Sequence, residues 1–334
     1  MKIGRQTYQF DNKICIRQTA TFAGSYEAKG NFKEFYDMVL QDDVCGCKTH
    51  ELCEIKMQKD LINHLLEKAS VKEEDIDFIF GGDIINQIMA TSFSARDFEI
   101  PFCGLYNACA TFGEALAIAS TFLDHHCNKI ICITSSHYAT AERLYRFPLE
   151  LGTQQTPNSQ WTVTGSGAVL LEKNIPNVPI ITMATFGKVM DLGCTDPNNM
   201  GAAMAPAACD TIIAHFKETG RSPDYYDMII TGDLGRFGRD TLNYLCKEQG
   251  YDCADKLNDC GSLIYSKKQK AGQGGSGAGC CSLVFSAYFY RLLMERQIKK
   301  ILFVPTGALL SKDSAMQGET IPSIAHAICI EMEN

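Results

Sequence analysis

An internal repeat is the feature that most constrains how this chain can fold. Residues 57–83 combine an amphipathic helical pattern with a short apolar strand that ends in GGD at Asp83. Residues 207–233 repeat this order, and their apolar strand ends in TGD at Asp233. Similarity at so long a period indicates that one structural unit occurs twice in the chain.

Three further pairs of segments recur in the same order, namely ATF at 20–22 and 184–186, KIICIT from Lys129 and KILFVP from Lys300, and AVLLE after GSG at 165–167 and AICIE after His326. Any α/β protein shows isolated echoes, but four in one order favour a duplication. We therefore predict an N-terminal half at 1–175 and a C-terminal half at 176–334. Each half is expected to contain a strand, a helix, a strand, a helix and two further strands. Short apolar strands are typical of a sheet covered by helices on both faces, so the expected class is α/β.

Composition excludes several classes of protein. The chain has 31 Lys+Arg against 39 Asp+Glu and a formal net charge of −8, so no general basic surface favours nucleic acid as a partner. The N-terminal MKIGRQTYQFDNK lacks the apolar core of a signal peptide, and no long uncharged apolar stretch follows. We expect a soluble chain. The 16 cysteines include no CxxC pair and no usual zinc-ligand spacing, which favours free thiols and no protein-held metal.

The next element of each half carries residues capable of chemistry. A strand is expected to end at IPFC, and a tight turn then presents Cys109. A helix of small residues with little charge follows, which predicts a helix buried on all sides. In the second half the glycine-rich run KAGQGGSGAG leads into another apolar helix. We expect the two helix starts to face each other across the pseudo-twofold axis of the repeat.

These motifs, with NAC before the first buried helix, TGSGAVLLE closing the first half and GGSGAG in the second, resemble the thiolase and ketoacyl synthase superfamily over nearly the whole chain. The resemblance implies a thiolase-like five-layered αβαβα fold built from two similar halves, and a homodimer. It also implies that Cys109 matches the nucleophile that accepts an acyl group. At a helix start, the helix dipole and free N–H groups stabilise a thiolate and lower the thiol pKa.

The partners that such a nucleophile needs are missing from the matching positions. Enzymes of the superfamily use histidine with asparagine, two histidines, or histidine with a second cysteine to move protons and stabilise the oxyanion. At the three positions that match these partners, this chain has Asp233, the segment KAGQGGSG, which contains no histidine, and the segment VPTGALLS. The resemblance therefore implies a binding protein with a degenerate site. The alternatives are a Cys109-dependent acyltransferase or condensing enzyme, with coenzyme A or acyl carrier protein as donor, and a purely structural subunit.

Longer segments resemble the stage V sporulation protein AD family of endospore-forming bacteria, namely SSHYATAERLYRFPLELG, MDLGCTDPNNMGAAMAPAACDT, NDCGSLIYS and IPSIAHAICIE. This resemblance implies a binding protein for dipicolinic acid (pyridine-2,6-dicarboxylic acid), taken up alone or together with calcium. It implies membrane-embedded SpoVA partners that move the ligand into the forespore and out at germination. The implied location is peripheral, at the inner spore membrane.

A flat aromatic dianion needs a slot with N–H and hydroxyl donors. We expect this slot beside Cys109 and name as candidate ligand-binding residues Cys109, His137, Asp233, Gly275, Ser276, Gly277, Ser311 and His326. Several have structural alternatives: a small buried thiol for Cys109, a satisfied structural histidine for His137, and a helix cap for Ser311. Asp233 is either a hydrogen-bond acceptor or a calcium ligand. Arg143 and Arg146 either pair with the ligand or make a surface contact.

Overall fold

The structure, a computed structural model, describes residues 1–140 and 155–333. The main elements of the first half are β1 (Thr7–Ala23), α1 (His50–Ala69), β3 (Phe78–Gly82), α2 (Met89–Ala95), β4 (Phe102–Gly104), α3 (Thr111–His125), β5 (Lys129–Ser136) and β7 (Gly165–Lys173). Those of the second half are β8 (Ile180–Thr185), α5 (Met200–Thr219), β9 (Met228–Thr231), α6 (Gly235–Glu248), β10 (Leu257–Asp259), α7 (Cys260–Ile264), α8 (Ala278–Val284), α9 (Tyr290–Met294), β12 (Lys300–Val304) and β15 (Ala327–Glu331).

Shorter elements surround the site described below. They are β2 (Met38–Val39), β6 (Trp161–Thr162), β11 (Gly275–Ser276), β13 (Thr306–Ala308), α10 (Lys312–Met316) and β14 (Ser323–Ala325). The strands β6 and β11 pair in parallel, and β13 and β14 pair antiparallel.

The two halves have the same sheet topology. The strand order is β4-β3-β5-β7-β1 in the first half and β10-β9-β12-β15-β8 in the second. In each half the first three strands of this order are parallel to one another. Each of the last two strands pairs antiparallel with the strand before it. The long strand β1 pairs with β7 through Ile14–Ala23 and with β8 through its N-terminal part, so the two sheets are hydrogen bonded along one strand.

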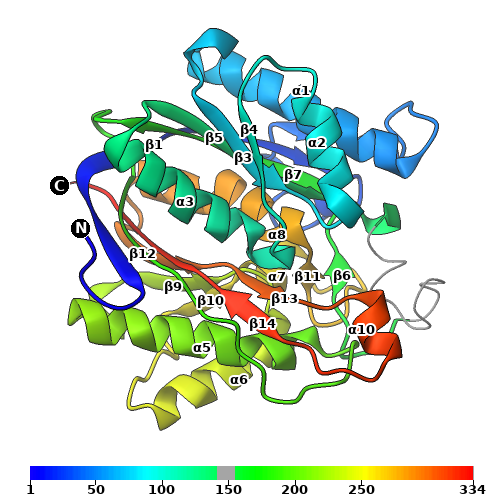
Figure 1. The fold of residues 1–334 in the computed structure, drawn as a ribbon. Helices are drawn as coiled ribbons and strands as arrows, with labels where there is room; N and C mark the ends of the chain where they lie inside the picture. The colour runs from blue at the N-terminus through cyan, green and yellow to red at the C-terminus, as the bar shows by residue number, and fades with distance from the viewer. Residues whose placement is uncertain (141–154, 334) are drawn as a thin grey trace.

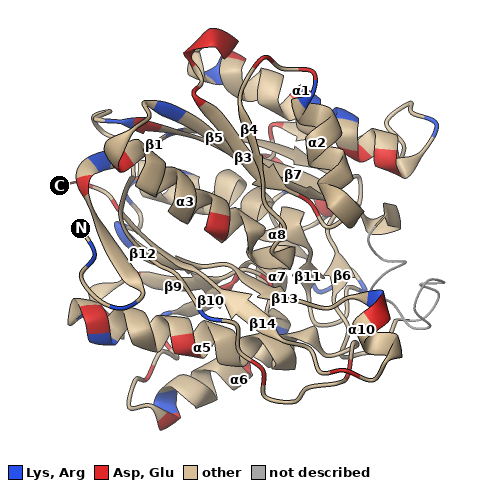
Figure 2. Cartoon of the chain, viewed as in Figure 1, with Lys and Arg blue, Asp and Glu red and all other residues tan. Residues whose placement is uncertain are grey.

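The elements form five layers, as predicted. Helices α1 and α2 cover the outer face of the first sheet, α5 and α6 cover the outer face of the second, and α3 and α8 lie between the sheets (Figure 1). Lys, Arg, Asp and Glu lie mainly on the outer helices and loops, with few in the central layer (Figure 2). A helix in contact with a sheet on both sides has no face for charged residues, which explains the composition of α3 and α8.

Local signals explain where the helices begin and end. In α1 the fully buried Met57, Leu61 and Leu65 form the predicted apolar stripe, and the Thr49 side chain caps the helix by accepting a hydrogen bond from Leu52 N. The helix therefore begins at His50, earlier than the pattern from residue 57 indicated, and ends at Ser70 in a left-handed conformation.

The six-element pattern predicted for each half was incomplete. It left out α2 and α6, and also β10, which has three residues and is too short to show a period, whereas the strand predicted before the turn at Cys109 is β4. The boundary predicted between the halves, residue 175, lies in the connection between β7 and β8. Among the helices in residues 1–140 and 155–333, none combines the length and apolarity needed to cross a membrane.

Candidate functional site

Cys109 lies in a tight turn between β4 and α3. The turn is a single 3-10 turn (Ala108–Ala110), and Ala108 has a φ of 49°. The Thr111 hydroxyl donates to Ala108 O at 2.7 Å and accepts from Asn107 N at 3.0 Å, which fixes the turn. The buried Cys281 of α8 packs against it, with its Sγ 3.7 Å from Cys109 O. The two central helices thus meet where the repeat predicted.

Asp233 follows β9 and joins three segments of the second half. Its Oδ2 accepts hydrogen bonds from Ser276 Oγ at 2.7 Å and Gly277 N at 3.1 Å, and its Oδ1 accepts from Thr306 Oγ1 at 3.2 Å. Both carboxylate oxygens therefore have protein donors. Burial raises the pKa of Asp233, while these donors oppose the rise. Asp233 thus accepts hydrogen bonds from the protein itself, and its role toward a ligand or calcium stays a prediction.

The thiol of Cys109 lies against this carboxylate. Its Sγ is 3.8 Å from Ser276 Oγ, the hydroxyl that donates to Asp233. Burial and then the charge of Asp233 raise the pKa of Cys109 well above its usual range. The prediction of a lowered pKa was wrong, because a nearby carboxylate and desolvation outweigh the partial charge of a helix start. Cys109 is a protonated thiol at neutral pH.

A small cavity opens beside Cys109. Its volume is about 20 Å³, and it is lined by Ile84, Ala108, Cys109, Thr162, Met200, Ser276, Gly277 and Ala308. The lining contains hydroxyl groups and a thiol but no charged side chain. This space holds about one water molecule. A ligand the size of a pyridine dicarboxylate enters only if lining side chains such as Met200 move.

His326 lies close to the turn but does not line this cavity. Its Nε2 is 3.1 Å from the side-chain amide of Asn107, and its Nδ1 accepts from Gly187 N at 3.2 Å. Burial lowers the pKa of His326 to about 4, so the ring is neutral at pH 7. With Nδ1 accepting, the neutral ring carries its proton on Nε2, and Asn107 satisfies this N–H when its amide presents Oδ1 rather than Nδ2 to the ring.

The structure separates two predicted residues from Cys109. His137 follows β5 directly, but its Nε2 is 2.8 Å from Asp43 O, and its ring centroid is 5.1 Å from that of His50. Ser311 is the N-cap of α10 and accepts from Ser314 N at 3.0 Å, which is the structural alternative considered for it. Gly275 lies in β11, beside Ser276, with its carbonyl accepting from Gln160 Nε2 at 3.1 Å. Arg143 and Arg146 lie outside the described residues.

Sequence analysis missed Asn107 and Thr306. Asn107 is the first residue of the NAC motif, so its position beside Cys109 was a usable signal. Thr306 lies in PTGALLS, and nothing in that run indicates that its hydroxyl bonds to Asp233. Within residues 1–140 and 155–333, no three His, Cys, Asp or Glu side chains are grouped so that they could hold a metal ion. The residues at Asp233 therefore do not fit a calcium site made by the protein alone.

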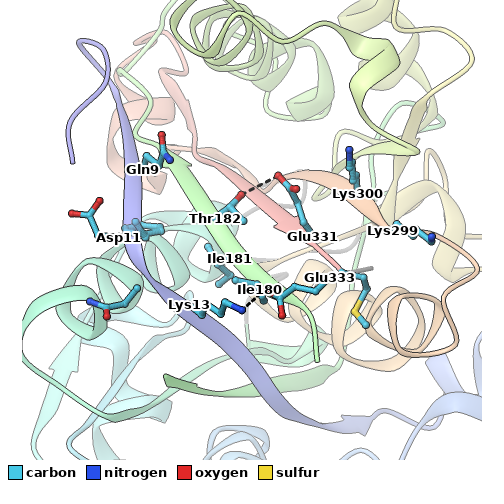
Figure 3. Close-up of a pocket in the computed structure, with 13 residues that line it drawn as sticks. Gln9, Asp11, Lys13, Ile180, Ile181, Thr182, Lys299, Lys300, Glu331 and Glu333 are labelled. Carbon is cyan, nitrogen blue, oxygen red and sulfur yellow. Dashed lines mark hydrogen bonds and ion pairs between the residues drawn. The ribbon is translucent and has the colours of Figure 1, made fainter. Parts of the chain in front are cut away.

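A larger cavity of about 690 Å³ lies elsewhere and contains none of the predicted residues. It is formed where β1, β8, β12 and β15 meet, and Figure 3 shows its lining. Several charged side chains that line it form ion pairs. Lys13 pairs with Glu333, and Glu331 pairs with Arg221 and accepts a hydrogen bond from Thr182. This balance of charge favours neither an anion nor a cation there.

Comparison with known proteins places the chain in a family. Residues 4–331 match the family described as Stage V sporulation protein AD. The chain belongs to this family of sporulation proteins. It is 41% identical over 329 residues to the Stage V sporulation protein AD of Bacillus subtilis (strain 168), with 98% of this chain and 97% of that protein covered. The resemblance found in the sequence is confirmed.

Solved structures share the fold of this chain. A variant of OleA from Xanthomonas campestris matches with a TM-score of 0.59 at 14% identity, covering 97% of this chain and 99% of that one. The 3-oxoacyl-(acyl carrier protein) synthase III, FabH, from Xanthomonas oryzae matches with a TM-score of 0.56 at 14% identity, covering 96% and 100%. These likenesses confirm the thiolase-like fold that the superfamily resemblance implied.

Proposed function

We propose that this protein is a non-catalytic, thiolase-fold binding protein for dipicolinic acid and its calcium complex. It acts in the SpoVA apparatus, which takes the ligand into the forespore during sporulation and releases it at germination. The proposal combines membership of a sporulation family with one observation on the site. That observation is the environment of Cys109, in which burial and then a carboxylate close to the thiol raise the pKa of the thiol.

An acyl-transferring cysteine needs a thiolate and a donor for the oxyanion. Cys109 instead faces Ser276 and, through it, Asp233. His326, a nearby histidine, is neutral and engaged with Asn107 and Gly187. This arrangement disfavours the acyltransferase alternative and leaves the hydroxyl and backbone donors of the site for ligand binding.

The ligand site that we propose is the slot beside Cys109, enlarged by movement of its lining. Ser276 Oγ and Gly277 N, both now bonded to Asp233, are the donors that a ligand carboxylate would take over. Since Asp233 then loses these donors, its own proton uptake would reduce the repulsion between two carboxylates. Calcium enters this proposal as part of the ligand, because the residues around Asp233 do not form a calcium site.

The remaining parts of the proposal concern partners and location. We propose a homodimer, membrane-embedded SpoVA partner proteins and a peripheral position at the inner spore membrane, and membership of the sporulation family supports this part of the proposal. The net charge of −8 supports no role for nucleic acid.

Titration calorimetry with dipicolinic acid, with and without calcium, tests the proposal. We expect saturable binding by the wild-type protein and weaker binding by Cys109→Ala, because the slot loses part of its wall. Cys47→Ala, at a partly exposed cysteine that does not line the slot, is the matched control and should bind as the wild type does. Absence of heat with either form of the ligand would refute the proposal. Acylation of Cys109 by an acyl coenzyme A, detected by peptide mass, would establish the acyltransferase alternative.

A further inference from the structure

A second cavity lies on the other side of the glycine-rich segment from Cys109. Its volume is about 460 Å³, and it is lined by Asn31, Arg236, Ser262, Tyr265, Ser266, Lys267, Gln269, Ala271, Gly272 and Gly274. This volume is within the range of small-molecule sites, roughly 300–1,000 Å³. The lining contains two cationic side chains and no carboxylate.

The cations of this cavity are not neutralised by neighbouring acids. One guanidinium N–H of Arg236 donates to Gly272 O, and no ion pair joins Arg236 or Lys267 to a carboxylate of residues 1–140 and 155–333. Lys268 and Lys270, exposed on the same loop, are equally unpaired among those residues. In a chain with 39 acidic residues, none occurs between Asp259 and Glu295. The local charge is therefore opposite to that of the whole molecule.

Two acids lie behind the cavity wall without cancelling this charge. Glu27 accepts a hydrogen bond from the Tyr265 hydroxyl, and Asp259 accepts from Ser262 N at 2.7 Å. Both carboxyl groups are buried, and burial raises the pKa of each to about 7. Each is thus partly protonated at neutral pH, and neither lines the cavity.

The loop is held in a fixed shape beside α6. Arg236 N donates to Gln273 O at 3.0 Å, and Gln273 N donates to Ser159 O at 2.9 Å. At Gly272, where φ is +55°, a Cβ atom would lie 2.0 Å from Ser159 O, so no side chain fits. The guanidinium of Arg236 and the ammonium of Lys267 are therefore presented to one cavity by two anchored segments.

We propose that this cavity is a binding site for a small dianion bearing carboxylate or phosphate groups. An arginine fork binds either group through two parallel hydrogen bonds, and a lysine supplies a second, compact charge. The free N–H groups of Arg236 and the ammonium of Lys267 are the donors. Bound anion also relieves the mutual repulsion of Arg236, Lys267, Lys268 and Lys270. The site goes beyond the proposed function, on which it rests only in the choice of dipicolinate as one probe.

The site lies next to the slot proposed for dipicolinate. Gly274 lines the anion cavity, whereas Ser276 and Gly277 line the cavity beside Cys109. One short segment thus forms a wall of both. An anion held by Arg236 and Lys267 is placed to change the position of the donors that face Asp233.

Calorimetry on the full chain tests the site with three probes: isophthalate, inorganic pyrophosphate and calcium-free dipicolinate. Isophthalate has the two carboxylates of dipicolinate without the ring nitrogen, and pyrophosphate replaces them by phosphate. We expect saturable binding of isophthalate or pyrophosphate, weakened about tenfold or more in R236Q/K267Q, since each lost contact is a hydrogen bond to a charged group. Whichever of the two binds identifies the carboxylate or the phosphate source.

The matched control is R239Q/K247Q. It also removes one arginine charge and one lysine charge, but both residues lie in α6 outside the cavity. Arg239 pairs with Asp240, and Lys247 pairs with Asp252. This variant and Cys109→Ala should bind isophthalate or pyrophosphate as the wild type does. Arg236 and Lys267 are exposed, so their substitution leaves the core unchanged, and circular dichroism verifies this. High ionic strength should weaken wild-type binding.

The proposal is overturned if neither isophthalate nor pyrophosphate binds the wild type, or if R236Q/K267Q binds them with unchanged affinity. Dipicolinate binding that is weakened by Cys109→Ala but unaltered in R236Q/K267Q, with no isophthalate or pyrophosphate bound, would leave the proposed function standing and refute this site. Isophthalate or pyrophosphate binding through Arg236 and Lys267, with no dipicolinate bound under any condition, would support this site and refute the proposed function.

Discussion

Replacement of Asp233 by asparagine should make Cys109 more reactive. The Cys109 sulfur and the Asp233 carboxylate contact the same Ser276 hydroxyl, at 3.8 and 2.7 Å, so they are at most about 6.5 Å apart. At an effective dielectric constant of about 20, two like charges at this distance repel by about 2.5 kcal/mol. This repulsion adds to burial in raising the pKa of Cys109, so removing the charge should lower that pKa. The asparagine side chain would retain the shape and much of the hydrogen bonding of the carboxylate, so the comparison isolates its charge.

A lower pKa produces about a hundredfold more thiolate, but a less basic thiolate is a weaker nucleophile, so the net acceleration expected is about tenfold. The assay is alkylation by iodoacetamide between about pH 8 and about pH 9.5, followed by mass spectrometry of the peptide that contains Cys109. The carboxyl of Asp233 loses its proton before the thiol in this range, because its charge is a cause of the raised pKa of Cys109. Alkylation of Cys47 in the same sample is the internal control.

Two results would refute this reasoning. Rapid alkylation of wild-type Cys109 at neutral pH would show an activated thiolate and would favour the acyltransferase alternative. Equal rates in the wild type and Asp233→Asn would show that the carboxylate does not control the thiol.

Three further predictions concern stability. Burial and then the charge of Asp83 raise the pKa of Glu54 above its usual value of 4.5, so the free energy of unfolding should fall as pH rises above about 4.5; urea titrations should show a flatter profile for Glu54→Gln. The contribution of His326 to stability has the opposite pH dependence. Burial lowers its pKa from 6.5 to about 4, so the free energy of unfolding falls by up to about 3 kcal/mol as pH falls from about 6.5 to about 4. His326→Gln should remove this fall in the same titrations. Gly167→Ala should lower the free energy of unfolding by about 3 kcal/mol in thermal denaturation, with an unchanged value contradicting the packing, because its Cβ would lie 2.2 Å from the backbone of Ser282.

Most of the fold could be predicted from patterns that burial imposes on the sequence. The stripe of Met57, Leu61 and Leu65 predicted α1 because one face of this helix packs on a sheet. The repeated GD after β3 and β9 predicted two equivalent strand ends, and Asp83 and Asp233 are indeed both buried at those ends. The short edge strand β10 escaped prediction, since three residues cannot show a period, whereas β4 was predicted from the apolar residues before the turn at Cys109.

The site could be predicted only where the signal was local. NAC and the glycine-rich run led to Cys109, Ser276 and Gly277, which the structure brings together. The pKa of Cys109 was predicted with the wrong sign because a local argument counts only the helix that follows, whereas Asp233 comes from the other half of the chain. The same limit applies to Thr306, whose role depends on a carboxylate distant in sequence.

The shared strand β1 determines how the molecule can come apart. Its residues Thr7–Gln9 pair with β8 and its residues up to Ala23 pair with β7, so neither half has a complete sheet without it. Removing one half would expose an unpaired strand edge and the apolar faces of α3 and α8 together. The duplicated halves therefore form a single cooperative unit, for which denaturant should produce one transition observed equally by every probe.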